Sequence, residues 1–160
     1  MNQNTPRAQD QKIDRQAARE FSFKFLYHLQ FPFHEEQRTP LLEEDELLKQ
    51  FQIFQVAPKS GLHPETINFA LGLVRGSLSH YEKIKIIISR YLVKKSVDSI
   101  NRIDFTLLIL GTYEICFHQK TPLNVVVNEC VELAKKYGTA ESSALVNAIL
   151  DKVKRENDSK

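Results

Sequence analysis

Three basic side chains near the N-terminus are spaced so that they could contact the phosphates of a nucleic acid. Lys12, Arg15 and Arg19 stand three and four residues apart, which places them in one column on a helix. The column would point away from the apolar side of that helix and could meet successive phosphates of a strand. Three charges alone favour a simpler interpretation, an ordinary solvated helix face. Both interpretations stay open at this point.

Aromatic residues accompany basic ones at two places and could stack on unpaired bases. Tyr27 follows the basic column on the same predicted helix, and an exposed tyrosine there could stack on a base. A tyrosine beside a packed apolar stripe is more often half-buried. Tyr91 stands close to Lys94 and Lys95 near the end of another predicted helix. The dipole of a helix end also favours a lysine pair, so this second group has two explanations of equal weight.

Motifs for other kinds of chemistry are missing from the sequence. It contains no Gly-rich phosphate loop, no G-x-S-x-G and no H-E-x-x-H, and its five histidines are scattered without the spacing of metal ligands. Cys116 and Cys130 form no C-x-x-C pair and fall on apolar helical faces, so we expect two reduced, buried thiols. The sequence therefore predicts no enzyme, no metal site and no cofactor.

The elements that must position these residues are predicted to be helices. Apolar residues recur at steps of three and four, the period of one helical face. About seven helices with short connections predict an all-α bundle. The first starts behind Asp14 as N-cap and ends near Phe31-Pro32. The others are expected at Leu41 to Phe54, Pro64 to Tyr91 with a bend near Gly76, Ile100 to Phe117, Pro122 to Gly138, and from Ser142 or Ser143 onward.

The stretch TPLNVVVNECVELAKKYGT, residues 121–139, needs a decision because three consecutive valines favour a strand. Its ends favour a helix: Thr121 can cap, Pro122 suits the first helical position, and Gly138 can supply a left-handed residue after the last turn. Burial of about 1.5–3 kcal/mol per large apolar side chain outweighs the low helix propensity of valine. The sequence therefore predicts a helix here.

Length and composition favour one domain. The chain has 160 residues, 42% of them hydrophobic, and a formal net charge of +2. We expect a polar leader over residues 1–12, one helical domain over residues 13–155 and a tail over residues 156–160. No apolar run is long enough to span a bilayer, and the N-terminus lacks the apolar core of a secretion signal, which predicts a cytoplasmic protein.

Three stretches of the chain resemble one known family. The run TPLNVVVNECVELAKKYGTAESSALVNAILDK, residues 121–152, is similar to the C-terminal signature of the NusB family of transcription antitermination factors. RIDFTLLILGTYEI, with Tyr113-Glu114, is similar to the preceding family helix. DRQAAREFSFKFLYHLQF, with Arg19-Glu20 and Leu26-Tyr27, is similar to the N-terminal one. The resemblance covers nearly the whole chain and is weakest from Pro32 to Pro64.

The resemblance implies an all-helical fold of two small packed bundles and a non-catalytic, RNA-binding function. Family members bind the boxA element of nascent ribosomal RNA, as single-stranded RNA, together with the ribosomal protein NusE, and promote read-through by RNA polymerase in the transcription elongation complex. A homodimer in the absence of that partner stays open. The alternative is a protein-interaction adaptor of the same fold with weak RNA binding. The N-terminal domain of a ribosomal RNA methyltransferase is disfavoured, because no cofactor-binding βαβ unit follows.

The resemblance also points to residues. The arginine-rich motif of the family would fall on residues 15–19, where only Arg15 and Arg19 are arginines, and Ile109 stands where the family often has an arginine. Matching the RNA-facing regions of the family adds a second set of candidates. The complete predicted RNA-binding set is Lys12, Arg15, Arg19, Tyr27, Tyr91, Lys94, Tyr137, Gly138, Glu141 and Ser142.

Overall fold

The computed structural model describes residues 13–29, 35–56, 61–93 and 95–159, and in these ranges every regular element is a helix. The all-α prediction is confirmed. None of the described helices is long and apolar enough to cross a membrane. In chain order the elements are α1 (Arg15–His28), α2 (Glu35–Leu42), α3 (Glu44–Val56), α4 (Pro64–Ser79), α5 (Tyr81–Ser89), the 3₁₀ turn η1 (Val97–Ser99), α6 (Arg102–Tyr113), the π-helical turn η2 (Glu114–His118), α7 (Leu123–Tyr137) and α8 (Ser142–Asp158).

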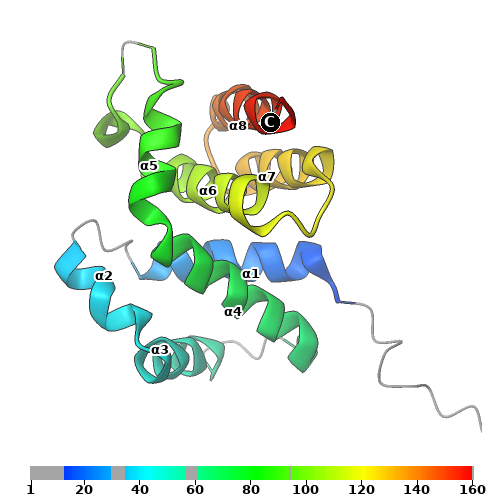
Figure 1. Ribbon diagram of the computed structural model, residues 1–160. Coiled ribbons are helices and arrows are strands. Elements are labelled where there is room, and N and C mark those ends of the chain that lie inside the picture. The colour runs from blue at the N-terminus through cyan, green and yellow to red at the C-terminus, as the bar shows by residue number, and fades with distance from the viewer. Residues whose placement is uncertain (1–12, 30–34, 57–60, 94, 160) are drawn as a thin grey trace, which may run out of the picture.

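The helices form two packed groups that meet at α6. In the first group α1 packs on α4, and α2 packs on α3 and α4; in the second, α7 and α8 pack on each other and on α6, with α5 beside them. Figure 1 shows α6 between α1 and α4 on one side and α8 on the other. Because α6 has neighbours on all sides, every one of its residues from Asp104 to Tyr113 is buried.

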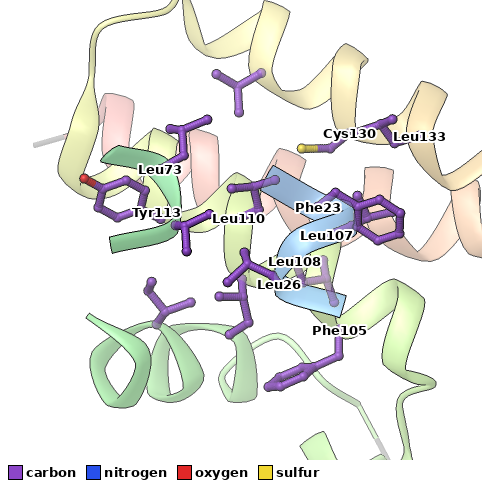
Figure 2. Close-up of a cluster of buried hydrophobic side chains, with 14 of the residues drawn as sticks. Phe23, Leu26, Leu73, Phe105, Leu107, Leu108, Leu110, Tyr113, Cys130 and Leu133 are labelled. Atoms are coloured by element: carbon purple, nitrogen blue, oxygen red, sulfur yellow. The ribbon is translucent and has the colours of Figure 1, made fainter. Parts of the chain in front are cut away.

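The hydrophobic core joins side chains from segments far apart in the sequence. In Figure 2, Phe23 and Leu26 of α1 meet Leu107 and Leu108 of α6. Cys130 and Leu133 add the inner face of α7 to the same core. Val126 and Val127 are buried on that helix as well, whereas Val125 is largely exposed. Burial of two of the three valines explains why a helix forms here in spite of valine's strand preference.

The helix boundaries differ from the predictions at several ends. The Asp14 cap is confirmed, since its side chain accepts a hydrogen bond from the Ala17 amide at 2.9 Å. The long pattern after Pro64 breaks at His80, which ends α4 and begins α5, and not at Gly76. The sequence interpretation missed α2 altogether, because that helix is polar and contains Pro40. Interior proline and a polar face are signals against a helix, and tertiary packing overrides them here.

Both ends of α7, and the start of α8, depart from the predicted capping. Pro122 occupies the N-cap of α7 and Leu123 is the first helical residue. Gly138 is extended, with φ −91° and ψ −168°, and not left-handed. Glycine is required there for space, because a Cβ would lie 2.4 Å from the Oγ of Ser142. Ser142 does not cap α8; its Oγ accepts a hydrogen bond from the Thr139 amide at 2.9 Å and holds the turn closed.

The two cysteines have different environments. Cys130 is fully buried in α7, and desolvation raises the pKa of its thiol to about 12. Cys116, predicted to be buried, is half-buried and lines a cavity of about 300 Å³ between α5, η2 and α8. The thiolate is the reactive form, so we expect a thiol reagent near neutral pH to modify Cys116 long before Cys130. Mass spectrometry of the native protein over time tests this, and equal labelling rates would contradict the burial of Cys130.

Candidate nucleic-acid interface

Arg19 is a buried residue and not a member of a solvated column. Its side chain is 1% exposed, and its Nε and Nη2 donate to the two carboxylate oxygens of Glu114 at 2.5 and 2.8 Å. The prediction of a solvated basic column is therefore wrong for Arg19. The physical reason is that α1 packs against both α4 and α6, which buries a wider sector of the helix than its phenylalanine stripe indicates.

The Arg19–Glu114 pair holds α1 against the end of α6. Burial works against the charged guanidinium, but the hydrogen bonds and the charge of Glu114 outweigh it, so the pKa of Arg19 is raised. The bidentate geometry is the one that arginine and carboxylate adopt in their strongest pairs. Both charges are thus paired inside the protein, and neither is available to a nucleic acid.

The side chain of Arg15 also makes its contacts within the protein. Its Nη1 donates to the carbonyl of Lys120 at 2.6 Å and to the Oγ1 of Thr121 at 3.1 Å, and its guanidinium lies 5.4 Å from the centre of the Phe69 ring. These contacts tie the start of α1 to the segment that leads into α7. Lys12, the third member of the predicted column, lies outside the described residues.

Aromatic rings of α1 and α7 form a continuous row next to α6. Tyr27 is 39% exposed, and the guanidinium of Arg102, the first residue of α6, lies 5.2 Å from the centre of its ring. The ring of Phe23 lies 6.3 Å from that of Tyr27 and 5.3 Å from that of Tyr137, at the end of α7. Tyr27 and Tyr137, two predicted RNA-binding residues, are thus brought together through Phe23.

Two lysines extend the row. The Nζ atoms of Lys24 and Lys136 lie 5.6 and 5.3 Å from the centre of the Tyr137 ring, at the range of cation–π contacts. Both side chains are at least half exposed. We call this surface the aromatic–basic row; its members are Lys24, Tyr27, Arg102, Lys136 and Tyr137.

The sequence reasoning missed the three cations of the row. Lys24 could have been found, because it stands three residues before Tyr27 and so shares a face of α1 with it. Lys136 is the immediate neighbour of the predicted Tyr137. Arg102 had no such signal, since only the fold brings the start of α6 to Tyr27.

The other predicted residues fall in different places. Gly138, Glu141 and Ser142 belong to the turn that follows Tyr137, at one end of the row; Glu141 is exposed and Ser142 is buried. Tyr91 is half-buried beyond α5, on a segment that carries no member of the row, and packs against the core. Lys94 lies outside the described residues. Ile109, at the position where an arginine was expected from the resemblance, is fully buried in α6.

Comparison with known proteins links this chain to one family. The NusB family model matches residues 16–155. The transcription antitermination protein NusB of Thermodesulfovibrio yellowstonii is 32% identical over 144 residues, which are 90% of this chain and 93% of that protein. The NusB protein of Geobacter sulfurreducens is 34% identical over 139 residues, or 87% of this chain and 92% of the relative.

Solved structures give the same result. The structure of T. maritima NusB matches with a TM-score of 0.72 and 28% identity, covering 93% of this chain and 99% of the other. A chain of the crystal structure of antitermination factors NusB and NusE in complex with dsRNA matches with a TM-score of 0.66 and 24% identity, covering 89% and 96%. At that identity the second match concerns the fold alone.

Proposed function

The chain belongs to the NusB family, and on this premise we propose that it is a transcription antitermination factor that binds boxA-type single-stranded RNA together with the ribosomal protein NusE. The complex acts on nascent ribosomal RNA as part of the transcription elongation complex in the cytoplasm, and the chain itself catalyses no reaction. Residues 13–155 serve as its RNA- and protein-binding domain. A solved complex of NusB and NusE with dsRNA contains a chain of this fold, and the family membership of the present chain is the reason for proposing a similar assembly for it.

The observation that carries the RNA-binding part of this proposal is the aromatic–basic row. Cations position a nucleic acid through its phosphates, and exposed aromatic rings stack on unpaired bases. Lys24, Arg102 and Lys136 supply the cations, and Tyr27 supplies an exposed ring. The cation–π contact of Arg102 with Tyr27 holds both groups at the surface in a fixed arrangement. We assign Tyr27 and Tyr137 to base contacts and the three cations to phosphate contacts.

The reason for a partner is that the described part of the candidate interface has few cations left for phosphate contacts. Arg15 and Arg19 are engaged within the fold, and three cations remain in the row. Each neutralised phosphate of a single strand contributes about −0.7 to the slope of log affinity against log salt, so the row gives a slope of about −2 when all three of its cations contact phosphates. A second basic surface on the partner would add contacts and make the slope steeper.

We expect labelled boxA RNA to bind more tightly, and with a steeper salt slope, in the presence of NusE than in its absence. Fluorescence anisotropy at two salt concentrations measures both quantities. Equal affinity with and without NusE would contradict the role of the partner. If the chain binds NusE but no RNA in either condition, the adaptor function is correct and RNA binding is wrong.

The variant Tyr27→Ala tests, in the same binding assay, whether Tyr27 stacks on a base of the RNA. Loss of one stacked base costs about 1–3 kcal/mol, so RNA affinity should fall by about 5- to 150-fold while NusE binding is unchanged. Tyr27→Phe keeps the ring and should bind RNA nearly as well as the wild type. An alanine variant with full affinity would remove Tyr27 from the interface.

A further inference from the structure

A carboxylate lies among the cations of the aromatic–basic row. The Oε1 atom of Glu20 accepts a hydrogen bond from the Nζ of Lys136 at 2.6 Å and another from the hydroxyl of Tyr137. The Nζ of Lys24 is 4.0 Å from the same oxygen. One oxygen of Glu20 therefore meets three members of the row, two of them cationic.

This arrangement is the one in which a phosphate oxygen would be bound. Two ammonium groups and a phenol hydroxyl converge on a single anionic oxygen, and a phosphate of a nucleic acid offers the same kind of acceptor. Burial by itself would raise the pKa of Glu20, but the hydrogen bonds from Lys136 and Tyr137 outweigh it and the pKa is lowered. Glu20 is thus an anion at neutral pH.

The surroundings of Glu20 add further negative charge. It lines a groove of about 360 Å³ between α1 and α7 together with Gln16, Glu129, Glu132, Leu133, Lys135 and Lys136. Lys135 pairs with Glu132 at 3.1 Å, and position 16 contributes no charge. Three carboxylates face two ammonium groups in this groove, so its net charge is −1. A phosphate that approaches Lys136 from this side meets repulsion as well as attraction.

We propose that Glu20 limits the affinity of the row for RNA, because its carboxylate occupies the position that an RNA phosphate would take between Lys24 and Lys136. This inference rests on the proposed RNA-binding function. For Lys136 to contact a phosphate, its hydrogen bond to Glu20 must break. Since the side chain of Lys136 is 59% exposed and that of Lys24 is 50% exposed, both ammonium groups can turn from Glu20 to a bound strand.

The substitution Glu20→Gln removes the negative charge of this side chain and keeps its shape. Glutamine has the same size, and its amide oxygen can still accept the Tyr137 hydroxyl, so the ring stays in place. Release of Lys136 adds about one phosphate contact, which steepens the salt slope by about 0.7 and raises affinity by about fivefold at 0.1 M salt. Glu20 would instead be a positioning residue for Lys136 and Tyr137 if removal of its charge weakened binding.

The experiment compares the wild type, Glu20→Gln and the control Glu132→Gln with a labelled single-stranded boxA RNA and with a scrambled RNA of equal length. Glu132 lines the same groove, is 63% exposed and pairs with Lys135, which is outside the row. We expect Glu20→Gln to bind both RNAs more tightly with a steeper slope, and Glu132→Gln to change neither by more than about twofold.

The outcomes separate this inference from the function on which it rests. If the wild type binds boxA RNA and Glu20→Gln binds it equally or more weakly, the inference is overturned and RNA binding stands. An equal gain in Glu132→Gln would also overturn it, because general charge and not the position of Glu20 would then be the cause. If neither the wild type nor Glu20→Gln binds RNA, both the inference and the RNA-binding function fail.

Discussion

Replacing Arg19 by methionine is expected to lower the free energy of unfolding by about 3–5 kcal/mol. The substitution leaves Glu114, 1% exposed at its side chain, without the guanidinium that satisfies both of its oxygens. An unpaired carboxylate inside a protein keeps the full cost of its desolvation. Urea denaturation followed by circular dichroism measures the loss.

Two further variants test whether the pair or the side-chain volume is responsible. Lys24→Met also replaces a cation of α1 by methionine, but at a side chain that is 50% exposed, and should alter stability by no more than about 0.5 kcal/mol. Arg19→Met combined with Glu114→Leu removes both charges and should recover most of the loss, as apolar replacements of buried ion pairs do. A single Arg19→Met variant as stable as Lys24→Met would show that the pair is not buried in solution.

This result decides how RNA-binding measurements at Arg19 are interpreted. When alanine replaces a solvated cation, a loss of RNA affinity measures the lost phosphate contact. When alanine replaces Arg19, part of the contact between α1 and α6 is lost as well. RNA binding would fall with the folded fraction. Arg102 and Lys136, which are exposed, are the positions where loss of affinity reports the interface itself.

Local signals in the sequence were enough to predict the helical fold. The period of the apolar residues and the Asp14 cap are properties of neighbouring residues, and they led to the right class. Arg19 shows where such signals fail. The period of the apolar residues ranks the faces of a helix by hydrophobicity, so it predicts that an arginine is exposed. Arg19 is buried because α1 packs against both α4 and α6.

The candidate site could be predicted only in part, for a related reason. Tyr27 and Tyr137 were found individually, but their contact through Phe23 depends on how α7 ends beside α1. Arg102 and Glu20 take part through tertiary contacts with Tyr27 and Lys136. The sequence around a charged residue does not indicate which distant ring or charge it contacts in the folded protein.

Tyr113 and Glu114, the pair at the end of α6, also make contacts that only the fold brings about. Glu114 contacts α1 through its ion pair with Arg19. Tyr113 packs against α4 at Gly76, where a Cβ would lie 1.9 Å from the Cζ of Tyr113. Adjacent residues thus dock α1 and α4, two of the four helices of the first group, at the end of α6. The tyrosine ring has little room to yield, because the rings of His80, Phe117 and His118 lie 5.7, 6.4 and 5.7 Å from it.

We therefore expect Gly76→Ala to destabilise the protein by about 1–3 kcal/mol through overpacking against Tyr113. Gly72→Ala is the matched control on the same helix: nothing lies within 4 Å of its Cβ position, so it should stabilise by up to about 1 kcal/mol through helix propensity. Thermal or urea unfolding of both variants gives the contrast.

A double-mutant cycle with Tyr113→Leu then tests the cause. If the clash with the ring is responsible, Tyr113→Leu should cost less in the Gly76→Ala protein than in the wild type, since the added methyl group occupies part of the space that the ring leaves. Additive effects, or a Gly76→Ala protein as stable as Gly72→Ala, would mean that α4 does not approach Tyr113 this closely. Close approach at Gly76 brings α4 to Tyr113, and α4 in turn packs on α1, which Glu114 also holds through Arg19. These two contacts fix the position of α1 and therefore of its exposed residues Lys24 and Tyr27.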